Sequence, residues 1–479
     1  MTDGKIFIDG QWAPSVSGDM IDVLSPSNGK VFARIARGGE VEIDLAVKAA
    51  RKSLNGEWGK LPPIERSRLL FRLSALISEN AEALLRLEAQ DTGKPLTQAR
   101  ADITACARYF EFYGGAADKL HGETIPYLDG YFVAVNREPH GVTGHIIPWN
   151  YPAQMFGRSL APALAVGNAV VLKPAEEACL TCLRLVELAD TAGFPPGAIN
   201  IVTGYGREAG AALSAHPDVD FLSFTGSPEV GTMVQKAAAE NHRPCVLELG
   251  GKSPQIIFSD ANFEEALPVV VNGIIQNGGQ TCSAGSRVLI QEDIFDEFAA
   301  ALGERISKLV VGAHEKDLNC GPLISAKQMG RVKSFIEQSQ SAGLTLIARA
   351  SLDPDAPEDG YYVPPALYGP VPEDSPLALK EVFGPILAAI PFKDEADAIR
   401  LANATEFGLV AGVWTQNGGR QMRLAKALRC GQVFINNYGA GGGVELPFGG
   451  VKHSGHGREK GFVAMHEFSV SKTVVFKHD

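Results

Sequence analysis

Two series of short apolar runs, each separated by segments of helix length, dominate the hydropathy pattern of this chain. Short apolar runs bounded by turn residues favour buried strands, and their alternation with helices favours a mostly parallel sheet covered on both faces. The first series follows residue 141, and its expected strands are residues 142–147, 169–173, 199–202, 219–224 and 245–249. This pattern predicts an α/β domain.

The second series begins after the glycine pair at 250–251. Asp260 is expected to cap a helix over residues 261–275, in which apolar residues recur at helical spacing. The further expected elements are strands at 287–290, 385–392, 409–415 and 430–436 and helices at 293–309 and 394–404. A second α/β domain is therefore predicted.

The rest of the chain contains a hairpin, helices and two isolated strand-like segments. The hairpin is expected around Asp9, and a helix over residues 63–88 with Pro63 at its start. Residues 119–140 and 466–477 look like strands that belong to neither series. Strand-rich extensions of this kind often pair between subunits, so they predict an oligomer.

Length, charge and cysteine content limit the classes of protein that fit. At 479 residues the chain is long enough for at least two domains. Its 44 Lys and Arg against 55 Asp and Glu leave a net charge of −11, which argues against nucleic acid or an anionic membrane as the partner. No signal peptide is visible, and the longest nearly apolar run, residues 160–172, is too short to span a bilayer. The 7 cysteines favour a reducing cytoplasm over a disulfide framework.

Three polar residues stand at strand ends or in a glycine-rich loop. Cys282 lies in the sequence QNGGQTCSAGSR, where free backbone donors suit an exposed nucleophile, and an ordinary packing thiol is the alternative. Glu248 ends an apolar strand, where a carboxylate is either functional or paired with a cation such as Lys252. Asn150 closes another strand at the same sheet edge, and its amide either serves an oxyanion or caps the next helix.

Two segments are candidates for binding a nucleotide. After the strand that ends at Phe224, Ser227 is expected to cap a helix beginning with Pro228, and free N–H groups at such a helix start attract a pyrophosphate. Lys173 and Glu176 end another strand of the same sheet, where they are placed to hold the hydroxyls of an adenosine ribose. The alternatives are a plain strand–helix junction and a surface Lys–Glu pair.

Two other motifs carry less weight. The sequence GYGREAG at 204–210 departs from the dinucleotide-binding fingerprint, because its third glycine comes one residue late and no acidic residue closes the next strand. Cys179 and Cys182 form a C-x-x-C pair without a second pair or a histidine cluster. We interpret the two cysteines as small packing residues of one helix and expect no metal site.

Seven motifs together point to one family. They are PWN (148–150), KPAE (173–176), FTGS (224–227), LELGGKSP (247–254), GQTC (279–282), EVFGPI (381–386) and PFGGVKHSGHGRE (447–459). Their residues and order resemble the aldehyde dehydrogenase superfamily over essentially the whole chain. The resemblance implies two doubly wound α/β domains, one Rossmann-like and one catalytic, plus a small β-strand oligomerisation element. The implied boundaries are 1–118 and 141–249 for the NAD(P)-binding domain, 250–460 for the catalytic domain, and 119–140 with 461–479 for the oligomerisation element.

The resemblance also implies a covalent mechanism. Cys282 is the implied nucleophile toward the aldehyde carbon, and the Asn150 amide together with the Cys282 N–H would hold the thiohemiacetal oxyanion. Hydride transfer to a nicotinamide leaves a thioester, which Glu248 hydrolyses by activating a water. The alternatives are a relative that passes the thioester to coenzyme A, which lacks such a Glu, and a catalytically silent structural relative, which would have lost the Cys, Glu or Asn.

NAD is the implied cofactor. A carboxylate at Glu176 repels a 2′-phosphate, although Lys173 beside it leaves NADP open. The implied cofactor-binding residues are Ile146, Pro148, Trp149, Lys173, Glu176, Gly206, Phe224, Gly226, Ser227, Val230, Leu249, Gly250, Glu381 and Phe383. The expected partners are a small aldehyde and further copies of the chain in a cytoplasmic homodimer or homotetramer, without nucleic acid or membrane.

The implied substrate pocket leaves the aldehyde open. Its residues are Gln154, Met155, Arg158, Gln276, Thr281, Ser283 and Phe448. Arg158 matches one carboxylate-binding Arg of succinate-semialdehyde dehydrogenases, but Gln276 stands where those enzymes have a second Arg. A semialdehyde acid, a larger polar or aromatic aldehyde, and a structural ion-pair role for Arg158 all remain open. The family commonly has a Lys where this chain has Ser159, so any supporting role of that Lys is not carried over to this chain.

Overall fold

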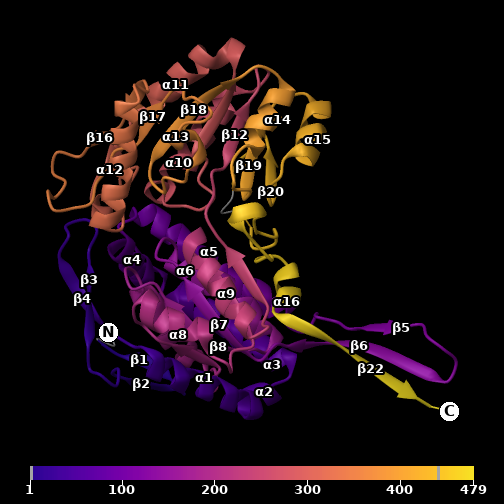
Figure 1. The fold of residues 1–479 in the computed structure, drawn as a ribbon. Coiled ribbons are helices and arrows are strands. Elements are labelled where there is room, and N and C mark those ends of the chain that lie inside the picture. Colours follow the sequence, from indigo (N-terminus) through magenta and orange to yellow (C-terminus); the bar gives the residue numbers. More distant parts are fainter. Residues whose placement is uncertain (1–3, 440–442, 479) are drawn as a thin grey trace.

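Two separate β-sheets with their helices form the body of the molecule, and a long strand arm projects from one side (Figure 1). The computed structural model describes residues 4–439 and 443–478, so the outermost ends of the predicted segments, residues 1–3 and 479, lie outside the described residues. The predicted α/β fold class with a small strand element is confirmed, whereas the residue boundaries of the domains stay a prediction.

The first sheet has eight strands in the order β2–β1–β9–β8–β7–β10–β11–β21. The strands from β9 to β11 run parallel, while β1, β2 and β21 pair antiparallel at the two edges. The bounds are β1 (Ile6–Ile8), β2 (Gln11–Ala13), β7 (Val142–Ile147), β8 (Ala169–Pro174), β9 (Ile199–Ile201), β10 (Phe221–Thr225), β11 (Cys245–Glu248) and β21 (Gly455–His456). The strands of the first predicted series and the hairpin around Asp9 are all present.

Helices α1, α6, α7 and α9 pack against this sheet. The helices of this part are α1 (Glu40–Asn55), α2 (Glu57–Lys60), α3 (Pro63–Glu79), α4 (Ala81–Thr92), α5 (Leu96–Ala116), α6 (Pro152–Val166), α7 (Leu180–Ala192), α8 (Ala211–Ala215), α9 (Pro228–Glu240) and α16 (Val463–Glu467). The prediction of one helix over 63–88 is wrong. The chain breaks at Asn80, whose backbone N–H and Nδ2 both donate to the Leu76 carbonyl at 3.0 and 2.8 Å.

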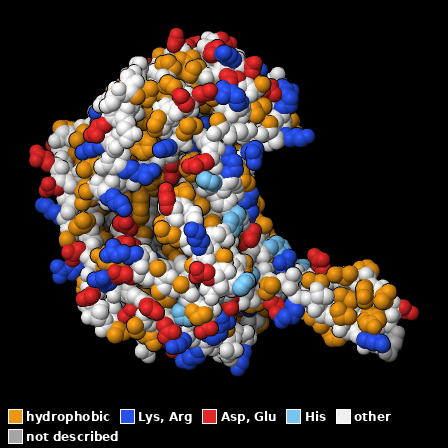
Figure 2. All heavy atoms as spheres, in the orientation of Figure 1, with side chains coloured by type: hydrophobic (Ala, Val, Ile, Leu, Met, Phe, Trp, Pro, Cys, Tyr) orange, Lys and Arg blue, Asp and Glu red, His pale blue; other side chains and the backbone are white. Residues whose placement is uncertain are grey.

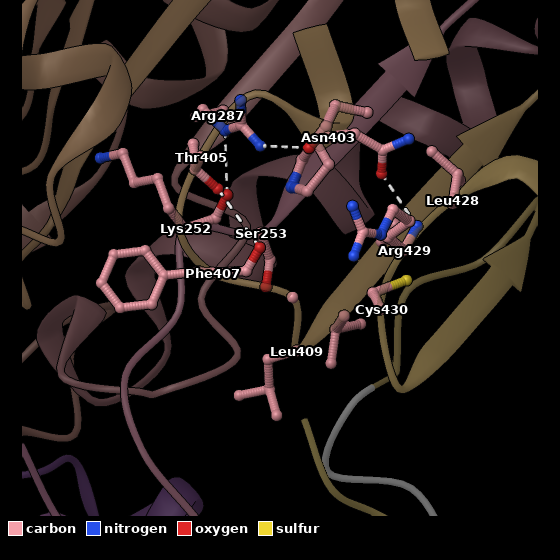
Figure 3. Close-up of a pocket in the computed structure, with 15 residues that line it drawn as sticks. Lys252, Ser253, Arg287, Asn403, Thr405, Phe407, Leu409, Leu428, Arg429 and Cys430 are labelled. Atoms are coloured by element: carbon pink, nitrogen blue, oxygen red, sulfur yellow. Dashed lines mark hydrogen bonds between the residues drawn. The ribbon is translucent and has the colours of Figure 1, made fainter. Parts of the chain in front are cut away.

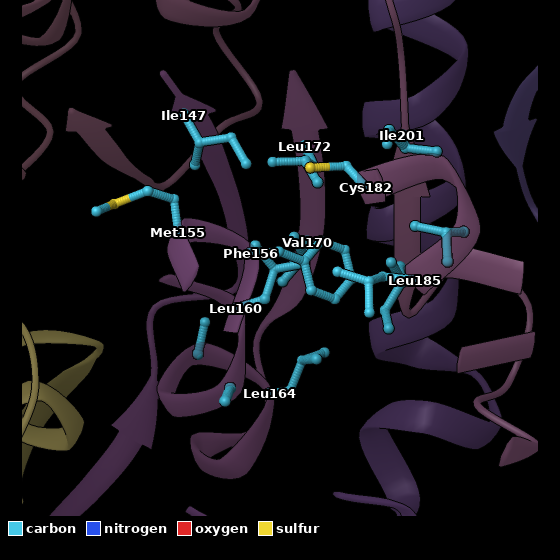
Figure 4. Packing of buried hydrophobic residues seen from close by; sticks show 14 of the residues in the cluster. Ile147, Met155, Phe156, Leu160, Leu164, Val170, Leu172, Cys182, Leu185 and Ile201 are labelled. Atoms are coloured by element: carbon cyan, nitrogen blue, oxygen red, sulfur yellow. The ribbon is translucent and has the colours of Figure 1, made fainter. Parts of the chain in front are cut away.

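The core of this part lies between α6, α7 and strands β7–β9 (Figure 4). Phe156 and Leu160 of α6 face Val170 of β8 in this core. Cys182 of α7 belongs to the same packing, and Cys179 is also fully buried. Both cysteines are free thiols, which confirms their interpretation as packing residues.

The second sheet has seven strands in the order β15–β17–β18–β13–β12–β19–β20, parallel except for β15. The bounds are β12 (Pro254–Ile257), β13 (Arg287–Gln291), β15 (Leu346–Arg349), β17 (Ala366–Tyr368), β18 (Ile386–Phe392), β19 (Val410–Trp414) and β20 (Gln432–Ile435). The helices are α10 (Phe263–Ile275), α11 (Phe295–Ser307), α12 (Ala326–Ser341), α13 (Pro376–Leu379), α14 (Glu395–Asn403) and α15 (Gly418–Ala427).

The predicted cap of α10 is wrong. Asn262, rather than Asp260, accepts a hydrogen bond from the Glu264 N–H at 3.1 Å and caps the helix. Asp260 instead accepts from the Thr415 hydroxyl at 2.8 Å and pairs with Arg420 at 3.1 Å, so its carboxylate ties α10 to the end of β19.

The arm consists of β5 (Glu123–Ile125), β6 (Tyr131–Pro139) and β22 (Ser469–Lys477). Strands β6 and β22 pair antiparallel over their whole length, although they are far apart in sequence. Figure 2 shows hydrophobic side chains gathered on the arm, and its exposed apolar residues are Ile125, Tyr127, Leu128, Phe132, Val470, Val475 and Phe476. Two small pairs complete the strands, β3 (Met20–Leu24) with β4 (Val31–Ala36) and β14 (Val310–Val311) with β16 (Ser351–Leu352).

Candidate active site

The carboxyl ends of neighbouring parallel strands gather the predicted polar residues at one edge of the first sheet. In the sheet register, Ile146 of β7 lies beside Lys173 of β8, and Thr225 of β10 lies beside Glu248 of β11. The loops that follow these strands therefore meet at one place, which is where open α/β sheets bind ligands. The second domain adds the loop that carries Cys282.

Close backbone contacts bring the cysteine loop to the end of β11. Asn277 and Gly278 adopt left-handed backbone angles, with φ of 50° and 63°, and turn the chain back after α10. A side chain on Gly251 would lie 2.3 Å from the Cys282 carbonyl oxygen, so only a glycine allows the two loops to touch. The glycines thus bring the cysteine loop against the segment that follows Glu248.

Cys282 is partly exposed, and its thiol is not ionised at neutral pH. Burial raises the pKa of Cys282 to about 12, Arg158 opposes this rise, and the carboxyl group of Glu248 adds to it. The thiol therefore needs a base before it can act as a nucleophile. Cys430, also partly exposed, donates to the Gln432 carbonyl at 3.2 Å in a separate pocket (Figure 3).

Asn150 is held by contacts on both its side chain and its backbone. Its Nδ2 donates to the Gln280 carbonyl at 2.9 Å, within the cysteine loop. Its own carbonyl accepts from Lys94 Nζ at 3.0 Å and from Asn277 Nδ2 at 2.8 Å. An amide has two N–H hydrogens, so one fixes the orientation and the second is available to a ligand. Helix α6 begins at Pro152 without a side-chain cap, so the helix-cap alternative for Asn150 does not hold.

A buried ion cluster supports Asn150 from behind. Lys94 is 1% exposed and pairs with Glu88 at 3.3 Å and with Asp102. Gln154 donates to the same Asp102 at 2.6 Å. Because buried charges of this kind keep one geometry, the cluster fixes the backbone of Asn150. Gln154, a predicted substrate residue, is thus engaged by the protein itself.

Glu248 is 1% exposed at the end of β11, and its partner is Arg158 rather than Lys252. The Nη2 of Arg158 lies 3.3 Å from Glu248 Oε2, while its Nε pairs with Glu459. Burial raises the pKa of Glu248 to about 8, although Arg158 opposes this rise. A carboxyl group that exchanges its proton near neutral pH suits a general base. These contacts support the ion-pair alternative for Arg158, and its role as a substrate anchor stays a prediction.

Lys173 and Glu176 form a pair at the end of β8. Lys173 Nζ donates to Glu176 Oε2 at 2.7 Å, and the Gly206 N–H donates to Glu176 Oε1 at 3.3 Å. Burial opposes ionisation, but Lys173 and the backbone donors outweigh it and lower the pKa of Glu176. Glu176 is therefore a carboxylate, an acceptor suited to the hydroxyls of a ribose.

Helix α9 starts as predicted, with Pro228 as its first residue and Ser227 as its cap. The Ser227 hydroxyl accepts from the Val230 N–H at 3.4 Å. A side chain on Gly226 would meet the Phe224 ring at 2.5 Å, so glycine is required where the chain passes this ring. The start of this 13-residue helix presents N–H groups that suit a phosphate.

Glu381 and Phe383 reach the same edge from the second domain. The Gly251 N–H donates to Glu381 Oε1 at 2.7 Å, and burial raises the pKa of Glu381 to about 7. A side chain on Gly250 would lie 2.5 Å from Glu381 Oε2. The Phe383 ring stands edge-on to Trp149 at 5.4 Å between centroids. The remaining predicted cofactor residues on this edge are Ile146, Pro148 and Leu249.

Aromatic side chains surround most of the predicted substrate residues near the thiol. Phe448 packs in one cluster with Cys282, and the Arg158 guanidinium lies 4.4 Å from its ring centroid. The Thr281 hydroxyl lies 2.7 Å from the Tyr151 hydroxyl. The Ser283 carbonyl accepts from the Tyr438 hydroxyl at 2.6 Å, and the Gln276 carbonyl accepts from Thr281 at 3.4 Å. Met155 lies instead in the core shown in Figure 4.

Arg287 holds the loop after Glu248 in place (Figure 3). Its guanidinium donates to the carbonyls of Lys252, Leu401 and Ala402 at 2.9, 2.8 and 3.0 Å. The small pocket beside it is lined by residues of this loop and of segments 402–411 and 428–430. Arg287 therefore belongs to the support of the site.

Several residues of the site carry no signal in the sequence. Lys94, Asn277 and Tyr151 have no assigned role in the motifs, and Glu459 stands in one motif without a role. Their burial and contacts alone reveal them. Among the described residues, none of the helices is long and apolar enough to cross a membrane, and no group of His, Cys, Asp and Glu is placed to hold a metal ion.

Comparison with known proteins agrees with this geometry. The model of the aldehyde dehydrogenase family matches residues 12–474. An aldehyde dehydrogenase of Emericella nidulans is 40% identical over 474 residues, which cover 98% of this chain and 95% of that protein.

Solved structures extend the likeness to the whole fold. The crystal structure of a Burkholderia cenocepacia protein assigned to the aldehyde dehydrogenases is 59% identical, covers 99% of this chain and 100% of its own, and superposes with a TM-score of 0.98. The NAD⁺ complex of an aldehyde dehydrogenase from Bacillus cereus is 40% identical, covers 100% and 97% of the two chains, and has a TM-score of 0.96. This chain therefore belongs to the aldehyde dehydrogenase family.

Proposed function

We propose that the chain oxidises an aldehyde to a carboxylic acid with NAD, through a thioester on Cys282. The observation that carries this proposal is the convergence of a thiol, a buried carboxyl group with a pKa of about 8 and a fixed amide donor at one sheet edge. When bound, the nicotinamide supplies the acceptor for a hydride. The NAD⁺ complex of the Bacillus cereus relative supports this choice of cofactor.

The first half-reaction joins the aldehyde to the enzyme. Glu248 takes the proton of the Cys282 thiol, and the thiolate attacks the aldehyde carbon. The carbonyl oxygen becomes an oxyanion, which the second Nδ2 hydrogen of Asn150 and the Cys282 N–H stabilise. Loss of a hydride from this carbon restores the C=O bond and leaves a thioester.

The second half-reaction releases the acid. Glu248 first releases the thiol proton to solvent. It then removes a proton from a water, the oxygen attacks the thioester carbon, and the Cys282 thiolate leaves and takes back a proton from Glu248. The presence of this carboxyl group favours hydrolysis over transfer of the acyl group to coenzyme A. The same carboxyl group, thiol and amide argue against a silent structural relative.

The contacts of Glu176 favour NAD over NADP. Its carboxylate is ionised and already shares Lys173, so a 2′-phosphate at this position would meet a negative charge. A ribose with free hydroxyls would instead donate to it. The Lys173 ammonium already pairs with Glu176, so it is less able to bind a phosphate.

The surroundings of the thiol favour an uncharged aromatic or apolar aldehyde. Arg158 is 4% exposed and engaged by Glu248 and Glu459, so a substrate carboxylate would have to displace one of them. Phe448 and the Tyr438 ring pack in the cluster that includes Cys282. An aromatic ring gains from such neighbours without needing a counter-ion.

The arm supports a homo-oligomer. A sheet of β5, β6 and β22 with exposed apolar residues such as Phe132 and Phe476 would be covered by a second copy of the chain. Seven free cysteines, one of them needed as a thiol, support a reducing, cytoplasmic location.

The test is NADH formation by Cys282→Ala, with Cys430→Ala as the matched control. We expect no turnover of any aldehyde by Cys282→Ala, retained cofactor binding, and near wild-type rates for Cys430→Ala. Turnover by Cys282→Ala near the wild-type rate would refute the proposal. For the substrate, benzaldehyde should exceed succinic semialdehyde in kcat/KM, and the reverse order would overturn the choice of an uncharged aldehyde.

A further inference from the structure

One cation faces two carboxyl groups behind the proposed base. Arg158 pairs with Glu248 at 3.3 Å and with Glu459, and the three side chains are only 4%, 1% and 1% exposed. Two buried carboxyl groups that share one guanidinium are costly away from water, and Arg458 and Lys460 are further cations that act on the group. Glu248 and Glu459 therefore compete for Arg158.

A chain of hydrogen bonds leads from His145 to Glu459. Ser223 Oγ donates to Glu459 Oε1 at 3.2 Å, and Ser159 Oγ lies 3.1 Å from Ser223 Oγ. His145 Nδ1 lies 2.6 Å from Ser159 Oγ. Because the Ser223 hydroxyl gives its one hydrogen to Glu459, Ser159 donates to Ser223 and accepts from His145. The chain thus ties the Glu459 carboxyl group to α6 and β7.

The far end of the chain is a buried histidine. Burial lowers the pKa of His145 to about 3, so its ring is neutral and carries one N–H. The Thr143 hydroxyl lies 2.8 Å from Nε2 and also donates to the Ala169 carbonyl at 3.4 Å. The chain therefore holds Glu459 in place beside Arg158.

We infer that Arg158 and Glu459 are positioning residues that decide when Glu248 can act as the base. Glu459 pairs with the same guanidinium, and its charge opposes the loss of a proton from Glu248. Arg158 favours that loss. The adjacent Ser159 contributes a hydroxyl to the chain that holds Glu459. This inference rests on the proposed function, in which Glu248 activates a water.

The charges around Glu248 shift its pKa in opposite directions. Arg158 of α6 and Arg458 of the loop after β21 favour the carboxylate form of Glu248, and Glu459 of the same loop disfavours it. Lys460 acts on the Arg158–Glu459 pair from the next position. Removal of Glu459 should therefore make Glu248 a carboxylate at lower pH, and removal of Arg158 should do so only at higher pH.

The test is the pH dependence of thioester hydrolysis. An aryl ester such as p-nitrophenyl acetate acylates a thiol without a hydride step, so the slow release of acetate that follows reports the base alone. The rate should rise with pH as Glu248 loses its proton. We expect the rise to move down by about one pH unit in Glu459→Gln and up by about one unit in Arg158→Gln.

Further variants separate positioning from general damage. Arg158→Lys should return the rise toward the wild-type pH, and Ser223→Ala should move it in the same direction as Glu459→Gln but less. Arg423→Gln removes the exposed pair with Glu395 and should leave the profile unchanged. If Arg158→Gln or Glu459→Gln does not fold, as judged by circular dichroism, Arg158→Lys and Ser223→Ala still carry the test.

Shifts of the same sign in both main variants, or no shift in folded variants, would overturn the inference. Glu248→Gln distinguishes this failure from failure of the proposed function. If Glu248→Gln hydrolyses the thioester at the wild-type rate, the proposed function is wrong. If Glu248→Gln is slow while the other profiles stay in place, only the positioning inference is wrong.

Discussion

Replacement of Asn150 by alanine probes the proposed oxyanion site with a magnitude that follows from its contacts. Nδ2 gives one hydrogen to the Gln280 carbonyl at 2.9 Å and offers the other to the oxyanion. Loss of a preorganised oxyanion donor lowers kcat by about 10²–10³-fold, which corresponds to about 2.7–4 kcal/mol. Loss of the Gln280 hydrogen bond should lower the free energy of unfolding by about 1 kcal/mol.

The backbone around Asn150 should survive this substitution. Lys94 and Asn277 donate to its main-chain carbonyl, which alanine keeps. The kinetic loss should therefore appear in folded enzyme, with cofactor affinity unchanged. Asn262→Ala is a matched control, because it removes an amide that caps α10 and costs a similar stability without reaching the site.

The assay is steady-state NADH formation with saturating NAD, together with thermal unfolding of each variant. Asn150→Ala should lose kcat by at least a hundredfold, and Asn262→Ala should keep it. A folded Asn150→Ala enzyme within about threefold of the wild-type kcat would refute the oxyanion role.

Three further predictions concern the base, the cofactor and the buried cluster. With a pKa of about 8, Glu248 is about one tenth ionised at pH 7, so thioester hydrolysis should rise about tenfold between pH 7 and 9; a flat stopped-flow profile would contradict this. Glu176→Gln removes the charge facing a 2′-phosphate and should raise the NADP to NAD ratio of kcat/KM by about tenfold; an unchanged ratio would exclude Glu176 from cofactor choice. Lys94→Met leaves Glu88 and Asp102 buried without a cation, so urea unfolding should show a loss of about 3–5 kcal/mol; wild-type stability would show that the cluster is not a structural support.

The elements and the place of the site could be predicted from the sequence because they depend on local pattern. Parallel strands end at one edge, so residues that follow them, such as Asn150 and Glu248, had to meet there. The Ser227 cap and Pro228 start of α9 also follow from local rules. The helix break at Asn80 could not be predicted from the sequence, because the apolar spacing continues through it.

Partner choice among buried charges depends on packing between distant segments. Arg158 lies on α6, and its partner Glu459 is about 300 positions away in the chain. For Glu248, the local pattern pointed to Lys252, which is nearer in sequence than Arg158. Lys94 likewise contacts Asn150 across 56 positions of the chain, from the segment before α5 to the segment before α6. Such contacts leave no periodic signal, so they emerge from the structure alone.

The most direct test of the covalent mechanism is the mass of Glu248→Gln after incubation with benzaldehyde and NAD. In this variant hydroxide has to take the thiol proton in place of Glu248, so the account predicts slow formation of the thioester and slower hydrolysis still. After a long incubation at alkaline pH, intact-mass and peptide analysis should find a benzoyl group on Cys282 and one equivalent of NADH. A Glu248→Gln enzyme that turns over at the wild-type rate, or a benzoyl group on Cys430 instead, would contradict it.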